Sequence, residues 1–154
     1  MAQHDRAVMT GGCQCGGVRY ALFAKPDKAS LCHCRMCQKA SGNLFQAFAG
    51  VGRDAFRWTR GTPGTFRSSE LIERDFCRDC GTPLTYRALD HDRISVTIGS
   101  LDQPGQVRPE CQYGVESIVF ELAMFADLPS QTTEQWAKPE RLVRLASRQH
   151  PDHD

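Results

Sequence analysis

Three of the eight cysteines lie within six residues, in the stretch CHCRMC at 32–37. The spacing lets the sulfurs of Cys32, Cys34 and Cys37 converge on one ion, particularly if a helical turn begins near Arg35 and brings Cys34 and Cys37 onto one face. Catalytic zinc sites keep three protein ligands and one open position, whereas structural sites are closed by four ligands. The cluster therefore predicts a catalytic zinc. Its fourth position would accept water or the sulfur of a thiol substrate, because soft thiolate sites favour soft partners.

Four further cysteines predict a structural zinc site. The segments GGCQCGG at 11–17 and FCRDCGTPL at 76–84 each supply two thiols at metal-ligand spacing. Gly81 follows the last cysteine of the second segment and helps the backbone fold tightly around the metal. Such a site would join the N-terminal strand region to the middle of the chain and would stabilise the fold directly. The predicted ligands are Cys13, Cys15, Cys77 and Cys80.

The three-cysteine cluster also has a structural interpretation, in which a fourth ligand closes the site. Cys111 and His33 are the two candidates for that ligand. His33 stands between two predicted ligands, so its ring is expected to point away from their metal. Cys111 is more typical of a small buried hydrophobic residue than of a reactive thiol.

Composition restricts the class of protein. The chain has 154 residues, enough for one domain with a real core. Its polar start, MAQHDRAVMTGG, is not a secretory signal, and no apolar run is long enough to span a bilayer. We therefore expect a cytoplasmic protein without a membrane partner, in which clustered cysteines bind metal rather than form disulfides. The formal net charge of +1 would fall to about −2 with both zinc sites filled, which argues against a nucleic-acid partner.

Short strands dominate the chain. Residues 115–125 are ambiguous, and the β-branched first half favours a strand. Residues 137–149 predict a helix with Pro139 in its first turn, packed on the sheet or on a partner subunit. We expect a tail over 1–10, a zinc-binding domain over 11–130 and a helical extension with its own tail over 131–154. The other expected strands are 17–24, 44–51, 55–58, 64–69, 71–76, 83–89 and 93–101.

The motifs resemble a known family. GGCQCGGVRY, CHCRMCQKASG, FCRDCGTPL, TIGSLDQP and ADLP occur in the order found in the glutathione-dependent formaldehyde-activating enzyme family, whose domain is also present in centromere protein V. The resemblance runs from about Gly11 to Pro129. It implies a mainly β (α+β), Mss4-like fold with two zinc ions, a short helix near the three-cysteine motif and a C-terminal helix. It also implies that Cys13, Cys15, Cys77 and Cys80 hold the structural zinc and that Cys32, Cys34 and Cys37 hold the catalytic zinc. The implied activity is that of a carbon–sulfur lyase acting on a glutathione adduct such as S-hydroxymethylglutathione.

Two positions depart from the family pattern. Gln112 stands where the family often has a histidine, and Phe120 is the nearest match to a usual tryptophan. Both are expected to affect the pocket wall or proton handling, so Gln112 is a candidate substrate contact.

Glutathione carries two carboxylates and one ammonium group. Cationic side chains near Cys32, Cys34 and Cys37, here called the triad, would therefore help to bind it. Arg35 and Lys39 are nearest in sequence, and Arg53 and Arg19 could approach in space. Ser41 and Gly42 could shape the mouth of the pocket. Taken singly, each cation is more typical of a solvated surface, and Ser41–Gly42 of a helix C-terminal turn.

Two other classes of function stay open. A non-catalytic binding module would have two closed zinc sites and no thiol ligand. A local basic patch for nucleic acid could be formed by Arg53, Arg57, Arg60 and Arg67, although an exposed strand face is the simpler account of these residues. A methionine-sulfoxide-reductase-like enzyme would use Cys111 as its nucleophile. The sequence leaves the oligomeric state open.

Overall fold

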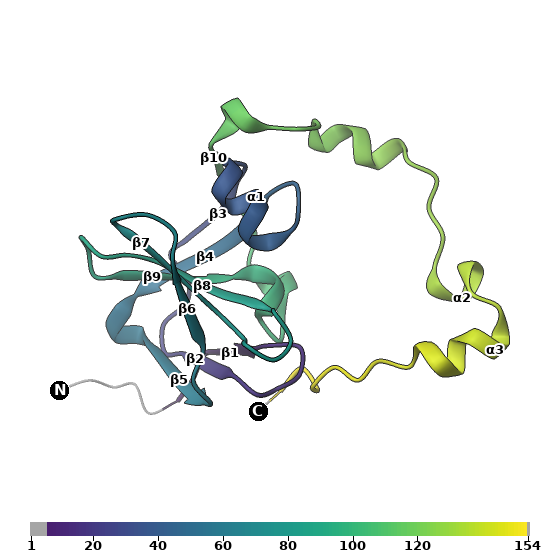
Figure 1. Cartoon of the computed structure of the whole chain (residues 1–154), viewed down its shortest axis with the longest axis horizontal. Coiled ribbons are helices and arrows are strands. Elements are labelled where there is room, and N and C mark those ends of the chain that lie inside the picture. Colours follow the sequence, from purple (N-terminus) through teal and green to yellow (C-terminus); the bar gives the residue numbers. More distant parts are fainter. Residues whose placement is uncertain (1–5, 154) are drawn as a thin grey trace.

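The computed structural model describes residues 6–153, in which two β-sheets share one core (Figure 1). Residues 1–5 of the predicted N-terminal tail and the final Asp154 lie outside the described residues. The helices are α1 (Arg35–Ser41), α2 (Thr133–Trp136) and α3 (Pro139–Leu142). The strands are β1 (Met9–Gly12), β2 (Arg19–Leu22), β3 (Lys28–Cys32), β4 (Gln46–Gly52), β5 (Phe56–Arg60), β6 (Gly64–Arg67), β7 (Ile72–Phe76), β8 (Pro83–Ala88), β9 (Arg93–Thr97) and β10 (Cys111–Tyr113).

The prediction of a mainly β fold with a short helix beside the three-cysteine motif is confirmed. The smaller sheet has the order β1-β2-β5, and the larger has the order β10-β3-β4-β9-β8-β7-β6. Neighbouring strands are antiparallel except β10, which pairs in parallel with β3. Strands β1, β3 and β10 were not among the predicted strands.

One face of the large sheet packs in the core. Its alternating residues include Ile94, Val96 and Ala49, which join Tyr20 and Leu22 of the small sheet in one hydrophobic cluster. Ile94 and Val96 were predicted to alternate into the core, and they are 3% and 0% exposed. Because strand side chains alternate between faces, the residues between them lie on the opposite face of the sheet, where they are free to build a site.

A buried ion pair ties the small sheet to the segment after β9. The guanidinium of Arg19 donates to both carboxylate oxygens of Asp102, at 2.9 and 2.6 Å. Their side chains are only 3% and 7% exposed. Burial raises the pKa of the Asp102 carboxyl, but the bonds from Arg19 and Thr10 outweigh it and hold that pKa below its ordinary value.

The strand predicted over 115–125 is wrong. Gly114 has a left-handed backbone, with φ of 64°, and ends β10 at this point. Two 3₁₀ helices follow, Val115–Ser117 and Leu122–Asp127. A β-branched sequence forms a strand only where a neighbouring strand can pair with it, and none of the described strands lies beside this segment.

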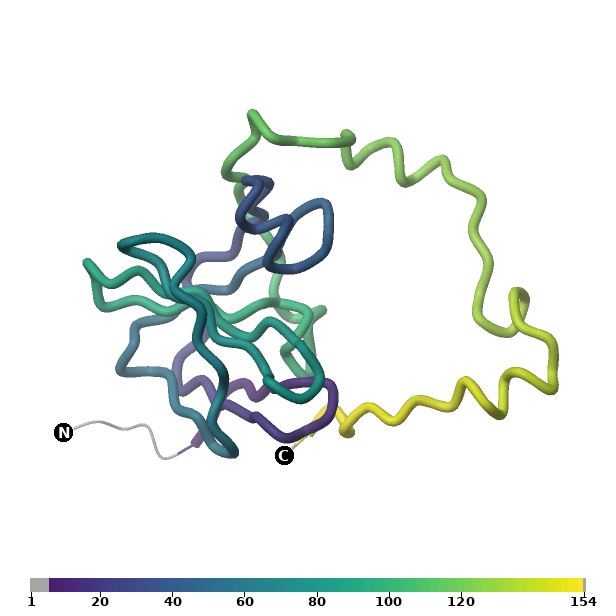
Figure 2. The backbone as a smooth tube through the Cα atoms, in the orientation of Figure 1, coloured from purple at the N-terminus to yellow at the C-terminus, as the bar shows by residue number. Residues whose placement is uncertain are grey.

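The helix predicted over 137–149 is shorter than expected. Pro139 does occupy its first turn, but α3 ends at Leu142 and continues only as a 3₁₀ turn, Val143–Leu145. The segment projects from the two sheets and returns at the C-terminal end, so α3 does not pack on the sheet (Figures 1 and 2). Within residues 6–153, none of the helices has the length and apolar character needed to cross a bilayer.

Replacing Asp102 by asparagine is expected to lower the free energy of unfolding at pH 7 by about 3 kcal/mol, because it removes the carboxylate that neutralises a buried guanidinium. The carboxylate's contribution is present above its unfolded pKa of about 3.9 and is lost as pH falls through the lower folded value. Urea unfolding of both proteins across this range should therefore show the difference shrinking with acid. Asp90→Asn, on the exposed surface, is the control. Equal stability of wild type and Asp102→Asn at pH 7 would contradict the prediction.

Candidate functional site

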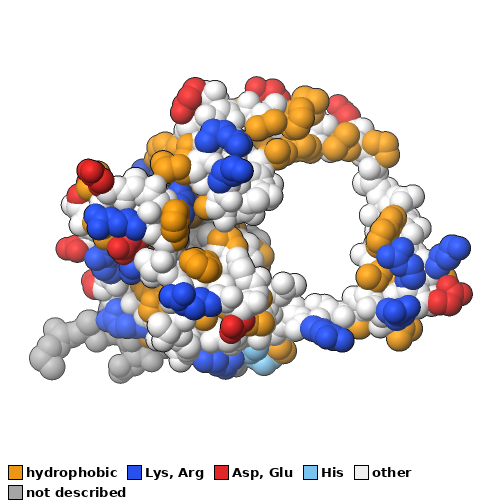
Figure 3. All heavy atoms as spheres, viewed as in Figure 1, with side chains coloured by type: hydrophobic (Ala, Val, Ile, Leu, Met, Phe, Trp, Pro, Cys, Tyr) orange, Lys and Arg blue, Asp and Glu red, His pale blue; other side chains and the backbone are white. Residues whose placement is uncertain are grey.

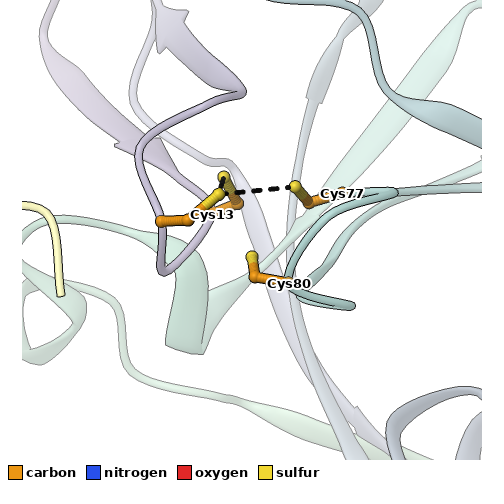
Figure 4. Close-up of side chains that lie close together, drawn as sticks. Cys13, Cys77 and Cys80 are labelled. Atoms are coloured by element: carbon orange, nitrogen blue, oxygen red, sulfur yellow. Dashed lines mark hydrogen bonds between the residues drawn. The ribbon is translucent and has the colours of Figure 1, made fainter. Parts of the chain in front are cut away.

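Four cysteines meet where two hairpin loops come together. Cys13 and Cys15 lie in the loop between β1 and β2, and Cys77 and Cys80 lie in the loop between β7 and β8 (Figure 4). Gly81 has φ of 76°, a conformation that glycine adopts without strain, and its N–H donates to the carbonyl of Cys77. The two loops belong to different sheets, so this cluster joins the small sheet to the large one.

The donor set of this cluster fits a closed metal site. The four sulfurs lie within 4.8 Å of one another. The sulfur of Cys15 lies 3.5 Å from that of Cys13 and 3.7 Å from that of Cys77. A tetrahedral zinc with 2.3 Å bonds places its sulfurs about 3.8 Å apart. Burial disfavours the Cys80 thiolate, yet bonds from Thr82 and from the backbone outweigh it and lower the pKa of that thiol to about 6.

The second cluster contains three sulfurs at the junction of β3 and α1. Cys32 ends β3, Cys34 is the residue before α1, and Cys37 lies in the first turn of the helix. The helical turn predicted near Arg35 therefore exists. The three sulfurs lie within 4.8 Å of one another, with Cys32 and Cys34 3.5 Å apart. This geometry also fits a metal ion, which would have three protein ligands here.

Neither proposed closing ligand joins this cluster within the part of the chain that is described. The Nε2 atom of His33 lies 2.8 Å from Oε1 of Gln112, and its ring packs against Phe45. Cys111 lies on β10, where its sulfur is 3.8 Å from the carbonyl of Ala29. Both residues stand outside the three-sulfur group. The geometry therefore favours an open site over one closed by His33 or Cys111.

The loop that carries the triad is tied to the segment around β10. Buried Gln38 donates through its amide to the carbonyls of His33, at 2.7 Å, and Ser117, at 2.9 Å. The backbone N–H of His33 donates to the carbonyl of Tyr113. Gln112, which stands where the resemblance implies a histidine, thus forms a hydrogen bond with His33 of this loop. It is not among the residues that line the cavity beside the triad.

That cavity, of about 330 Å³, opens over the outer face of the large sheet. One row of paired residues crosses five strands beneath it: Arg74, Tyr86, Ser95, Gly50 and Lys28. A second row contributes Phe48 and Ser30. The described residues of the lining include the triad together with Lys28, Arg74, His91 and Arg93, and none of them carries a carboxylate. The cavity can therefore accommodate an anionic molecule that reaches the sulfurs.

Arg74 is the charged group in direct contact with the triad. It is 8% exposed, and its Nη2 lies 3.4 Å from the sulfur of Cys37. Its Nε donates to Ser68 at 3.2 Å, and its guanidinium lies 5.0 Å from the ring centre of Tyr86. Among the ion pairs of the described residues, none joins Arg74 to a carboxylate. Because buried charges are normally paired, its counter-charge is the thiolate cluster or a bound anion.

Burial and Arg74 act in opposite directions on Cys37. Burial raises the pKa of this thiol to about 12, while the Arg74 hydrogen bond opposes that rise. Metal binding would release the proton, since only the thiolate is a ligand.

The structure separates the predicted substrate contacts from the cavity. Arg35 and Lys39 line a neighbouring groove formed by α1, β6 and β7, which shares only Met36 and Arg74 with the cavity. Ser41 donates to the carbonyl of Cys37 at 2.8 Å, and Gly42 ends the helix with φ of 62°, so both form the helix C-terminal turn.

Arg19 and Arg53 also lie away from the cavity. Arg19 pairs with Asp102, and Arg53 donates to the carbonyl of Ala88. Phe120 is on the projecting segment and is 51% exposed. Sequence reasoning missed Lys28, Arg74, Tyr86 and Arg93. A charged residue inside a short strand that ends at a ligand cysteine, as in IERDFC, is the signal that could have identified Arg74.

Comparisons with known proteins bear on this geometry. The family model described as "Glutathione-dependent formaldehyde-activating enzyme" matches residues 8–117. A Schizosaccharomyces pombe protein named "Uncharacterized lyase C29B12.13" is 30% identical over 76 residues, which is 49% of this chain and 55% of that relative. The chain thus matches about half the length of this relative. A crystal structure of a Rhodobacter sphaeroides protein is 22% identical and covers 68% of this chain and 99% of its own, with a TM-score of 0.54, which shows a shared fold.

The two clusters should respond differently to loss of a ligand. We expect Cys34→Ser to lose one metal ion and remain folded, because the triad lies at the end of one strand. We expect Cys77→Ser to lose at least one ion and unfold, because binding to a four-cysteine zinc site contributes about 10 kcal/mol or more, comparable to the whole stability of a domain. Elemental analysis and circular dichroism measure the two effects, with Cys111→Ser as the control. Two ions retained in either ligand variant would contradict this assignment.

Proposed function

The chain belongs to the glutathione-dependent formaldehyde-activating enzyme family, and from that premise we propose that it is a zinc-dependent carbon–sulfur lyase. Its proposed substrate is a thiol adduct, with S-hydroxymethylglutathione as the leading example. The observation that carries the proposal is a three-thiol cluster that opens into a cavity with a cationic lining. The lyase name of the fission-yeast relative supports the same reaction class.

The proposed reaction joins a thiol sulfur to the carbonyl carbon of an aldehyde; the C=O π bond breaks and the oxygen takes the proton that the thiol loses. The reverse reaction breaks the carbon–sulfur bond and restores the aldehyde and the thiol. A zinc ion held by Cys32, Cys34 and Cys37 would supply a Lewis acid that lowers the pKa of a substrate thiol. The four-cysteine cluster would hold a second zinc with a structural role, since its four ligands leave no open position.

The chain's own residues would orient the substrate. Lys28 lies on the cavity floor, with its ammonium 5.3 Å from the ring centre of Tyr113. Arg93 lines the same cavity and pairs with Asp27. We assign these two cations to the substrate's carboxylates. Arg74 would be the positioning residue that neutralises the triad and keeps its sulfurs in place.

Residues on the sheet would also limit access of water. Phe48 and Tyr86 pack with their ring centres 5.4 Å apart and cover part of the cavity floor. A partly apolar wall strengthens the electrostatic interactions of the cations beside it. A cytoplasmic location, where glutathione is abundant, belongs to the same proposal.

Zinc measurements on reduced, freshly purified protein test the open site. We expect two zinc ions per chain, one of which becomes labile or spectroscopically perturbed when millimolar glutathione is added. Cobalt substitution provides the readout, because the absorption of cobalt thiolates changes when a further thiol coordinates. S-methylglutathione, which has no free thiol, is the control ligand. Two ions that are both indifferent to glutathione would overturn the open-site proposal in favour of a closed binding module.

The proposed role of Arg74 predicts a graded series. Arg74→Gln should weaken metal retention by the triad and lower kcat/KM about 10- to 100-fold, the range typical for residues that support metal ligands. Arg74→Lys should recover part of both, because it restores charge without the planar fork. Competition with a chelator measures retention independently of activity. Arg87→Gln, which breaks a pair with Glu73 on the neighbouring strand, is the matched control. Unchanged retention and activity in Arg74→Gln would show that the contact with Cys37 has no functional role.

A further inference from the structure

Residues 118–149, here called the C-terminal arm, project from the two sheets and return to them. The arm begins just after Ser117, which is bonded to Gln38. It ends at His150, whose N–H donates to the carbonyl of Gln14 and whose ring lies 3.1 Å from Arg60. Figure 3 shows an opening between the arm and the rest of the molecule. Fixed at both ends, the arm cannot act as a free tail.

The arm has locally encoded structure. Thr132 and Gln135 form a reciprocal capping box at the start of α2. Pro139 occupies the first turn of α3, and the Arg141 guanidinium lies 5.1 Å from the ring centre of Trp136. These local interactions specify helical turns in a segment that does not pack against the two sheets. Disordered linkers have few large apolar residues and no such helix caps. The sequence of the arm is therefore not that of a disordered linker.

The apolar side chains of the arm are exposed. Among them are Val119, Phe120, Met124, Phe125, Leu128 and Trp136, each between 39% and 59% exposed. The accessible surface of the chain is 10,403 Å². A folded monomer of 17.2 kDa is expected to expose about 7,800 Å². The excess of about 2,600 Å² resembles the area that each subunit of an extensive dimer buries.

The charges on the arm are divided between its halves. Residues 118–132 contain two acidic residues, Glu121 and Asp127, and no basic residue. Residues 133–149 contain four basic residues and two acidic ones. The acidic half and the basic half therefore carry formal charges of −2 and +2. In a two-fold symmetric pair, the first half of one arm can face the second half of the other, and the same contact then occurs twice.

From these observations we propose that the C-terminal arm pairs with the arm of a second copy of this chain. The acidic half of each arm lies against the basic half of the other, and the exposed apolar side chains of both are buried between them. The excess surface and the caps indicate that the arm is covered by a folded partner, and the opposite charges of its two halves favour a second copy as that partner. The proposal is independent of the lyase activity, because none of the arm residues lines the cavity beside the triad.

Charge reversal tests the pairing on the full, zinc-loaded chain. Wild type should have a molar mass of twice 17.2 kDa by light scattering and sedimentation at micromolar concentrations. The variant Glu121→Lys with Asp127→Lys makes both halves basic, and the variant Lys138→Glu with Arg144→Glu makes both halves acidic. Each variant alone should dissociate at least about tenfold more readily. An equimolar mixture should form a heterodimer, because every contact is again between opposite charges.

The control reverses two acidic residues on the body, Asp90→Lys with Asp92→Lys, which are exposed and outside the arm. It should dimerise like wild type. Zinc content and circular dichroism establish that each variant is folded. A monomeric wild type would overturn the proposal and would indicate that the arm folds onto its own body or binds a different partner. Reversal variants that dimerise normally, or a mixture that stays monomeric, would equally overturn it.

Discussion

The four-cysteine cluster is the constraint on which the rest of the structure depends. Its ligands lie in two hairpin loops that belong to different sheets and are separated by more than 60 residues of chain. The hairpin that carries Cys77 and Cys80 also carries two residues of the cavity. Arg74 lies three residues before Cys77, and Tyr86 lies six residues after Cys80. Fixing that loop therefore fixes the strand positions that form the cavity floor. A structural metal would act on the cavity floor through the register of β7 and β8.

The large sheet uses its two faces for different purposes. Alternate residues of β3, β4 and β9 face the core, where Ala29, Ala49 and Val96 are buried. The residues between them, such as Lys28, Gly50 and Ser95, face the cavity. A strand with one face in the core cannot shift its register by one residue without exposing its apolar side chains. Core packing thus positions the polar residues of the cavity without requiring any contact between them.

Much of this arrangement could be predicted from local sequence. The cysteine spacings predicted both ligand clusters, and the alternation of Ile94 and Val96 predicted which face of β9 enters the core. The cavity could not be predicted, because it depends on register between strands far apart in sequence, such as the pairing of Lys28 with Gly50 and of Gly50 with Ser95. Nearness in sequence suggested Arg35 and Lys39 as substrate contacts, but their side chains line the neighbouring groove beside β6 and β7 and are not among the residues that line the cavity. The strand prediction over 115–125 failed because strand propensity has effect only beside a pairing partner.

Charge explains why the two cysteine clusters have different surroundings. Four thiolates around a divalent ion carry −2; Cys13 and Cys77 in that cluster are buried, but Cys15 is exposed, so water reaches the charge from one side. Three thiolates around such an ion carry −1, and Cys37 in that cluster is 1% exposed. A charge out of water needs a partner, and Arg74 occupies that position with its guanidinium already desolvated. Once Arg74 balances the triad, Lys28 and Arg93 are the other Lys or Arg side chains of the described lining, and Arg93 is already paired with Asp27. In the proposed lyase, the charge that balances the triad and the charge that would bind the substrate thus belong to different residues of one cavity.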